Sequence, residues 1–116
     1  MDTEYLPESL ERSEVDALPG KTVVQFGTNW CGYCVGARRV IDGALDPVAD
    51  IRRILVEDGR GRPLGRSYGV KLWPTLIFLC DGAEVARVVR PSRARDLEPA
   101  MAALRAACAQ PGDLST

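Results

Sequence analysis

The chain has 116 residues, of which 46% are hydrophobic and 27% are charged, and its formal net charge is −1. A chain of this length and composition is typical of one globular domain that buries its core without a metal or disulfides, which excludes fibrous and disordered classes. The charge is uneven, because residues 1–20 carry six acids and one base while the remainder is mildly basic.

The first thirty residues contain no apolar run long enough for a signal-peptide core, and no stretch approaches the ~18 apolar residues of a membrane span. We therefore expect a cytoplasmic protein, in which thiols stay reduced and the four cysteines do not form a disulfide framework. Residues 1–7 are predicted to be an acidic leader or a short edge strand. Residues 8–18 are predicted to form a packing helix that ends before Pro19-Gly20.

Two cysteines lie where a strand turns into a helix. The apolar run 22–26 predicts a buried strand, the sequence Asn-Trp-Cys-Gly-Tyr-Cys occupies residues 29–34, and apolar residues at helical spacing predict a helix over 34–45. The first N–H groups of a helix have no intrahelical partner and the helix dipole favours negative charge there. A thiolate at Cys31 is therefore expected to be stabilised, with a pKa below the ordinary ~8.5.

The rest of the chain alternates between short apolar segments and turn residues. We expect a buried strand over 51–57, a short helix over 64–68, a strand over 75–80 and a returning strand over 84–90. The strand 51–57 is predicted to run parallel to the first, because a helix connects them. A final helix is expected to be capped by Ser92 or Asp96 and to carry the apolar stripe Leu97, Met101, Leu104 and Cys108. Residues 110–116 are predicted to be a flexible tail.

The strand before the cysteines, the helix after them and the sequence Trp73-Pro74-Thr75 ahead of a later strand together resemble the thioredoxin family. The resemblance covers residues 8–109 in order, without large insertions. It implies an α/β thioredoxin fold, in which helices cover both faces of a central mixed β-sheet.

The resemblance also implies roles for individual residues. Cys31 corresponds to the family's nucleophile and Cys34 to its resolving thiol, and Pro74 corresponds to the family's cis-proline. The residues implied to contact substrates are Trp30, Gly32, Tyr33, Trp73, Pro74 and Thr75. The implied function is a thiol–disulfide oxidoreductase that reduces protein disulfides and is recharged by an upstream dithiol donor such as a thioredoxin reductase.

This sequence departs from the family pattern at two sites that bear on the chemistry. Thioredoxins bury an aspartate six residues before the first cysteine, where this chain has Gln25, which does not titrate and cannot act as a base. Deprotonation of Cys34 would then rely on water or on Glu57 or Asp58. The Gly32-Tyr33 dipeptide resembles that of bacterial periplasmic disulfide isomerases, so we expect a dithiol less reducing than thioredoxin's ~−270 mV.

Three other functions remain open at this point. Tyr33 favours a disulfide oxidase or isomerase as the alternative within the class, and a non-catalytic module switched by oxidation is the alternative outside it. A zinc site would need Cys80 and Cys108 as further ligands, because the chain has no histidine. We interpret these two cysteines instead as small buried apolar residues, with a partly exposed, oxidisable Cys80 beside the Asp81-Gly82 turn as the alternative. We expect no metal, no cofactor beyond the Cys31–Cys34 disulfide, no nucleic-acid or membrane partner, and a monomer.

Overall fold

Among residues 4–7 and 10–109, which the computed structural model describes, four strands form one sheet in the order β2-β1-β3-β4. The strands are β1 (Lys21–Gly27), β2 (Ile51–Glu57), β3 (Thr75–Cys80) and β4 (Ala83–Val89). The helices are α1 (Arg12–Asp16), α2 (Gly32–Leu45), α3 (Pro63–Ser67), the short 3₁₀ helix η1 (Ala94–Leu97) and α4 (Glu98–Ala107).

The sheet is mixed, as predicted. β1 is parallel to β2, to which it is connected through α2, and antiparallel to β3. In the register of the sheet, Val24 faces Ile54 on one side and Ile77 on the other. β1 therefore lies inside the sheet, paired on both sides over residues 21–26, and the turn that carries Cys31 directly follows it.

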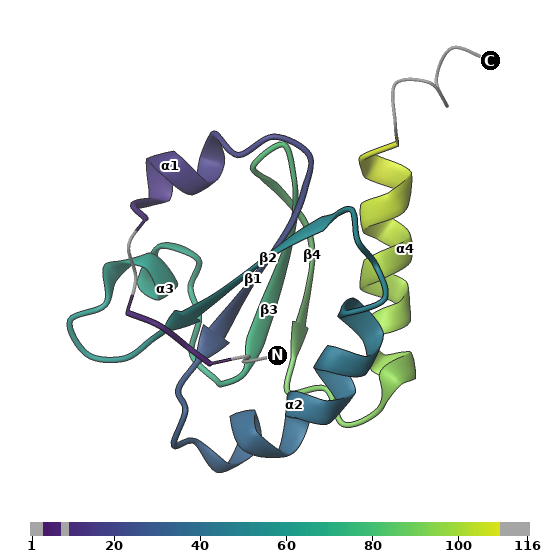
Figure 1. Ribbon diagram of the computed structural model, residues 1–116. Coiled ribbons are helices and arrows are strands. Elements are labelled where there is room, and N and C mark those ends of the chain that lie inside the picture. Colours follow the sequence, from purple (N-terminus) through teal and green to yellow (C-terminus); the bar gives the residue numbers. More distant parts are fainter. Residues whose placement is uncertain (1–3, 8–9, 110–116) are drawn as a thin grey trace.

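Helices cover both faces of the sheet, which confirms the thioredoxin fold (Figure 1). Side chains alternate along β1, so Val23 joins the core under α2 and α4, while Val24 and Phe26 join the core under α1 and α3. The first core contains Val23, Ala37, Ile41, Leu45, Leu76, Phe78, Leu97, Ala100 and Leu104. The second contains Val15, Val24, Phe26, Val56, Leu64, Tyr68, Ile77 and Leu79.

The first helix is shorter than the predicted 8–18. The N–H of Glu11 donates to the carboxylate of Glu14 at 2.9 Å, which fixes the start of α1 at Arg12, and residues 8 and 9 lie outside the described part of the chain. In contrast, α2 begins at Gly32, two residues before the predicted start, so that Cys31 is its N-cap. Both cysteines of the pair therefore belong to the first turn of the helix or to its cap.

The last helix begins after the predicted caps. Asp96 accepts hydrogen bonds from the N–H groups of Ser92 and Arg93, but it does so within η1, and α4 itself begins at Glu98 with Pro99 in its first turn. Leu97 and Leu104 are buried in the first core, with Met101 packed against it. The predicted tail 110–116 lies outside the described residues.

The interpretation of Cys80 and Cys108 as small buried apolar residues was wrong. The two cysteines are half-buried and joined in a disulfide. Cys80 ends β3, and Cys108 directly follows α4, which packs along that strand. Their Cα atoms lie 5.4 Å apart, within the range that a disulfide requires. Sequence spacing did not indicate this contact, since 28 residues separate the two cysteines.

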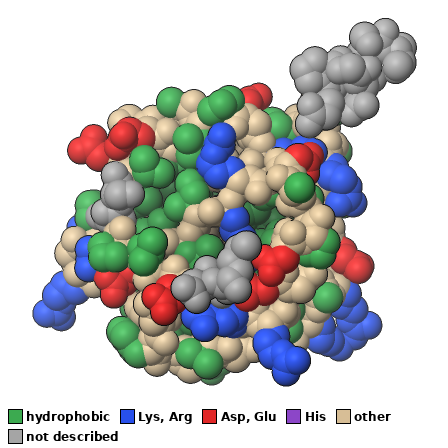
Figure 2. All heavy atoms as spheres, in the orientation of Figure 1, with side chains coloured by type: hydrophobic (Ala, Val, Ile, Leu, Met, Phe, Trp, Pro, Cys, Tyr) green, Lys and Arg blue, Asp and Glu red, His purple; other side chains and the backbone are tan. Residues whose placement is uncertain are grey.

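The face in Figure 2 shows acidic and basic side chains interspersed, with apolar side chains between them rather than one continuous field of a single charge. No helix within the described residues is long and apolar enough to cross a membrane.

Candidate active site

Cys31 lies at the end of the turn that connects β1 to α2, as the N-cap of that helix. Its N–H donates to the hydroxyl of Thr28 at 3.1 Å, and its carbonyl accepts the N–H of Val35 at 2.9 Å, which closes the first turn of the helix. Gly32 follows, and a Cβ atom there would have no neighbour within 4 Å. The half-buried Cys31 is therefore the accessible sulfur of the pair.

The pKa of the Cys31 thiol is lowered from its ordinary value. Burial acts in the opposite direction and raises it, but hydrogen bonds from the backbone and thiol of Cys34 and from the backbone of Tyr33, together with the charge of Arg90, outweigh that effect. These donors are the free groups at the start of a helix, as the sequence predicted. The arrangement therefore favours the thiolate form of Cys31 relative to an ordinary cysteine.

Cys34 has the opposite environment. Its side chain is only 2% exposed, and this burial raises the pKa of the thiol to about 11. A thiolate at Cys31 raises it further, while hydrogen bonds from the backbone of Thr28 and from the hydroxyl of Tyr5 lower it. The two sulfurs thus suit different steps, since the pKa of the half-buried Cys31 is lowered and that of the buried Cys34 is raised.

Exposed aromatic side chains flank Cys31 in the sequence. Trp30 is 74% exposed and Tyr33 is 60% exposed, although both are large and apolar. The ring of Trp30 meets that of Trp73 edge-on at 5.9 Å, and the guanidinium of Arg90 lies 3.7 Å from the centre of the Tyr33 ring. The structure thus brings together the predicted contact residues from two distant segments of the chain.

The peptide bond between Trp73 and Pro74 is cis. Arg90 fixes the backbone of this dipeptide with two hydrogen bonds: its side chain donates to the carbonyl of Trp73 and its backbone N–H donates to the carbonyl of Pro74, both at 2.8 Å. Pro74 and Thr75 are buried, unlike the other predicted contact residues. Thr75 also donates its hydroxyl hydrogen to the carbonyl of Leu72. Its contribution to the surface is therefore limited to the backbone.

Gln25 is buried on β1, and its side chain is hydrogen-bonded at both ends. Its amide nitrogen donates to the hydroxyl of Tyr5 at 2.6 Å, and its amide oxygen accepts from the guanidinium of Arg53 at 3.1 Å. The two acids proposed as substitutes for a base are engaged elsewhere, since Glu57 pairs with Arg62 at 2.7 Å and Asp58 accepts from the indole of Trp73 at 2.8 Å.

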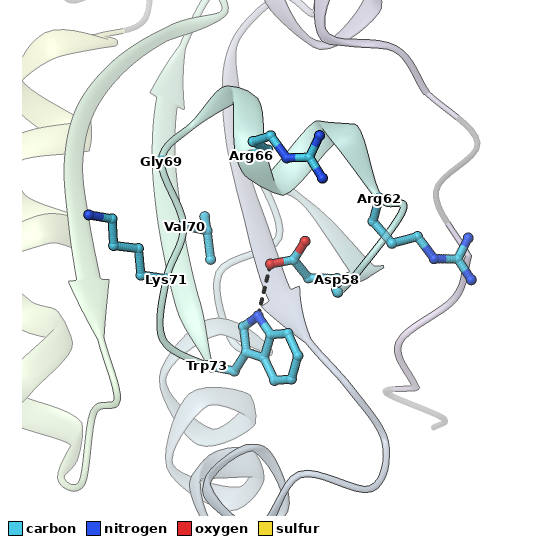
Figure 3. Close-up of a pocket in the computed structure, with 8 residues that line it drawn as sticks. Asp58, Arg62, Arg66, Gly69, Val70, Lys71 and Trp73 are labelled. Atoms are coloured by element: carbon cyan, nitrogen blue, oxygen red, sulfur yellow. Dashed lines mark hydrogen bonds between the residues drawn. The ribbon is translucent and has the colours of Figure 1, made fainter.

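A cavity of about 370 Å³ lies beside Trp73, on the side where Asp58 accepts the indole N–H (Figure 3). Its lining includes Arg62, Arg66 and Lys71, from the basic stretch that precedes Trp73 in the sequence. Glu57 pairs with Arg62, and the Asp58 carboxylate also lines the cavity, so its positive charge comes from Arg66 and Lys71 and is partly offset by Asp58. The cavity adjoins the candidate site through the Trp73 ring.

Four residues that contact the site were not singled out from the sequence: Tyr5, Thr28, Asn29 and Arg53. Thr28 and Asn29 belong to the turn itself, whereas Tyr5 and Arg53 reach Gln25 from 20 and 28 residues away. Gly27 was the available indication for Tyr5, because a glycine inside a buried strand often marks a close approach of another group.

The described residues do not bring the two cysteine pairs together as metal ligands. Cys80, Asp81 and Cys108 have ligand atoms within 4.8 Å of one another, and neither Cys31 nor Cys34 belongs to that group. Since Cys80 and Cys108 are bonded to each other, their sulfurs are not available as separate thiolates.

Comparisons with known proteins place this geometry in a family. The family model of thioredoxin matches residues 6–103. The chain is similar to the structure of thioredoxin 2 from Pseudomonas aeruginosa in its reduced form, with 48% identity over 92% of this chain and 99% of that one and a TM-score of 0.81. A thioredoxin structure from Nicotiana alata has 26% identity to this chain over 80% of both chains, with a TM-score of 0.67. A thioredoxin of Aspergillus fumigatus is 25% identical over 68% of this chain and 73% of its own length.

Proposed function

Because the chain belongs to the thioredoxin family, whose redox role makes it an oxidoreductase, we propose that it reduces disulfide bonds of protein substrates with the Cys31/Cys34 dithiol. The observation that carries this proposal is the contrast between the two thiols, with the pKa of Cys31 lowered and that of Cys34 raised. Only a thiolate attacks a disulfide, so this contrast assigns the first attack to Cys31.

The reaction then proceeds in two exchanges. The Cys31 thiolate attacks one sulfur of the substrate disulfide, forms a mixed disulfide and releases the other substrate sulfur as a thiolate that takes a proton from water. Cys34 loses its proton and attacks the Cys31 sulfur, which breaks the bond to the substrate and releases the second substrate thiolate. The substrate gains two electrons, and the protein retains a Cys31–Cys34 disulfide.

A substrate peptide would lie across the aromatic surface beside Cys31. Trp30 and Tyr33 are exposed on one side of it, and the half-buried Trp73 and the buried Pro74 lie on the other, with open space at Gly32. Exposed aromatic rings on a surface are typical of protein-binding sites, because they bury a large apolar area at a small entropic cost.

Regeneration requires a second dithiol. A donor such as a thioredoxin reductase would return two electrons to the Cys31–Cys34 disulfide, and a reducing compartment such as the cytoplasm would keep the pair as a dithiol between turnovers. The Gly32-Tyr33 dipeptide favours a disulfide oxidase or isomerase as the second candidate function. As an oxidase, the Cys31–Cys34 disulfide would accept two electrons from a substrate dithiol; as an isomerase, the Cys31 thiolate would rearrange substrate disulfides without net electron transfer.

We expect the protein to accelerate the precipitation of insulin in the presence of a small dithiol donor, and Cys31→Ser to reduce the rate to that of the donor alone. The double variant Cys80→Ser/Cys108→Ser is the matched control, since it removes two cysteines away from the site and should leave the rate close to that of the wild type. Equal rates for the wild type and Cys31→Ser would contradict the proposed function and favour a non-catalytic module switched by oxidation.

A further inference from the structure

Tyr5 brings a buried hydroxyl to the resolving cysteine. Its side chain is 4% exposed, and its ring lies against Gly27 and Cys34. A Cβ atom at Gly27 would lie 2.6 Å from the Cys34 sulfur and 2.8 Å from Cζ of the Tyr5 ring. The missing side chain at residue 27 therefore creates the space in which the phenol and the sulfur meet.

The backbone of Tyr5 is fixed to the same turn that carries the cysteines. Its N–H donates to the side-chain oxygen of Asn29 at 2.8 Å, and the amide nitrogen of Asn29 donates back to the Tyr5 carbonyl at 3.0 Å. The next residue, Leu6, pairs with Val56 of β2, with the Glu57 N–H donating to the Leu6 carbonyl at 2.7 Å. These contacts hold the phenol in place from both sides.

The directions of the hydrogen bonds around Tyr5 follow from one group that can only donate. The guanidinium of Arg53, which Asp42 binds at 2.7 Å, has no acceptor, so it must face the amide oxygen of Gln25. The amide nitrogen of Gln25 is then directed at the Tyr5 oxygen, 2.6 Å away, and donates to it. Because the Tyr5 oxygen accepts this hydrogen bond, its own hydroxyl hydrogen does not point at Gln25 and is free to point toward Cys34.

We propose that Tyr5 donates a hydrogen bond to the sulfur of Cys34 during the second exchange and thereby stabilises the thiolate that attacks the mixed disulfide. This inference rests on the proposed function and deepens it, since it names a group that assists Cys34 in a chain with Gln25 where the family has a buried acid. Gln25 and Arg53 are positioning residues, because they act on Cys34 only through the phenol.

The phenol acts here as a donor and not as a base. Burial raises the pKa of the Tyr5 hydroxyl well above its ordinary value, so the hydroxyl keeps its proton throughout the reaction. The Cys34 proton leaves to water, the Cys34 sulfur bonds to the Cys31 sulfur, and the substrate sulfur departs with the electron pair of the broken bond. The hydrogen bond from Tyr5 favours the charged form of Cys34 against the desolvation that disfavours it.

The chain offers a closely matched pair of variants. Tyr5→Phe removes one hydroxyl and keeps the ring that fills the space beside Gly27. Tyr68→Phe removes the other buried phenolic hydroxyl, which has no hydrogen-bond partner among the described residues and belongs to the core under α1 and α3. A loss of packing or of one buried hydroxyl in general would affect both variants, whereas the proposed role affects the first alone.

The decisive readout is the alkylation of Cys34 by iodoacetamide in a Cys31→Ser background at pH 8–9, followed by peptide mass spectrometry. A hydrogen bond to a charged group corresponds to a pKa shift of about one to two units, partly offset by the higher nucleophilicity of a more basic thiolate. Tyr5→Phe should therefore slow alkylation about three- to tenfold, with Tyr68→Phe unchanged. In the otherwise native chain, decay of a mixed disulfide should slow by a similar factor while attack by Cys31 is unchanged.

An equal or faster alkylation rate in folded Tyr5→Phe would overturn the inference, as would equal slowing in Tyr68→Phe. If circular dichroism shows that Tyr5→Phe does not fold, Gln25→Met replaces it, because this variant removes the donor that orients the phenol. Slower alkylation of Cys34 in Gln25→Met would support the inference, and an unchanged rate would overturn it. Alkylation involves no disulfide substrate, so a failure to reduce insulin would contradict the proposed function without altering this result.

Discussion

Replacing Cys34 with serine is expected to stop turnover and to leave substrates covalently attached to Cys31. The first exchange needs only the accessible sulfur with the lowered pKa, and this sulfur remains in the variant. The second exchange needs the sulfur one helical turn further on, and a serine hydroxyl is far too weak an acid to supply an equivalent nucleophile. The mixed disulfide should therefore accumulate instead of decaying.

The measurement is non-reducing electrophoresis of wild type and Cys34→Ser after mixing with oxidised insulin, followed by mass spectrometry of the adduct. We expect an adduct at Cys31 in Cys34→Ser, no adduct in Cys31→Ser/Cys34→Ser, and insulin precipitation no faster than with the dithiol donor alone. Continued turnover by Cys34→Ser would show that Cys34 does not resolve the intermediate.

Loss of the Cys80–Cys108 disulfide is expected to lower the free energy of unfolding by about 3–4 kcal/mol, the value that loop-closure entropy gives for a loop of this length. The bond joins the end of β3 to the residue after α4 across 28 positions. Leu97, Ala100 and Leu104 still bury the same face of the terminal helical segment in its absence, so the native fold should persist.

Urea denaturation of Cys80→Ser/Cys108→Ser against the wild type, both without reductant, measures this contribution. The variant Cys31→Ser/Cys34→Ser is the control for the other pair; adding reductant to it should reproduce the loss, because only the Cys80–Cys108 bond remains to be reduced. Wild-type stability in Cys80→Ser/Cys108→Ser would contradict a stabilising role for this disulfide.

The sequence predicted the parts of the fold that depend on local pattern. The apolar runs over β1, β2 and β3 and the helical spacing after Cys34 are strong periodic features, and each appears within a few residues of its predicted bounds. The placement of Cys31 at a helix start was equally local, which is why the direction of its pKa shift could be anticipated.

The features that the sequence did not reveal all depend on contacts between distant segments. Tyr5 reaches Gln25 across 20 residues, and Cys80 reaches Cys108 across 28, and neither distance is encoded in a spacing rule. The expectation for the cysteines failed for a further reason: it was inferred from a presumed compartment, whereas the disulfide depends on the approach of α4 to the end of β3. Gly27 indicated that another group approaches the backbone of β1 closely at this position, but it could not identify that group as Tyr5.

In the proposed function Cys31 attacks the substrate disulfide and Cys34 resolves the mixed disulfide, and the pH dependence of alkylation tests this division of roles most directly. The reduced protein is treated briefly with iodoacetamide over a range of pH values, and mass spectrometry follows each cysteine separately while circular dichroism confirms the fold. We expect Cys31 to titrate below the ordinary thiol value of ~8.5 and Cys34 only toward about 11. Two thiols with the same midpoint, or Cys34 reacting first, would contradict this division of roles.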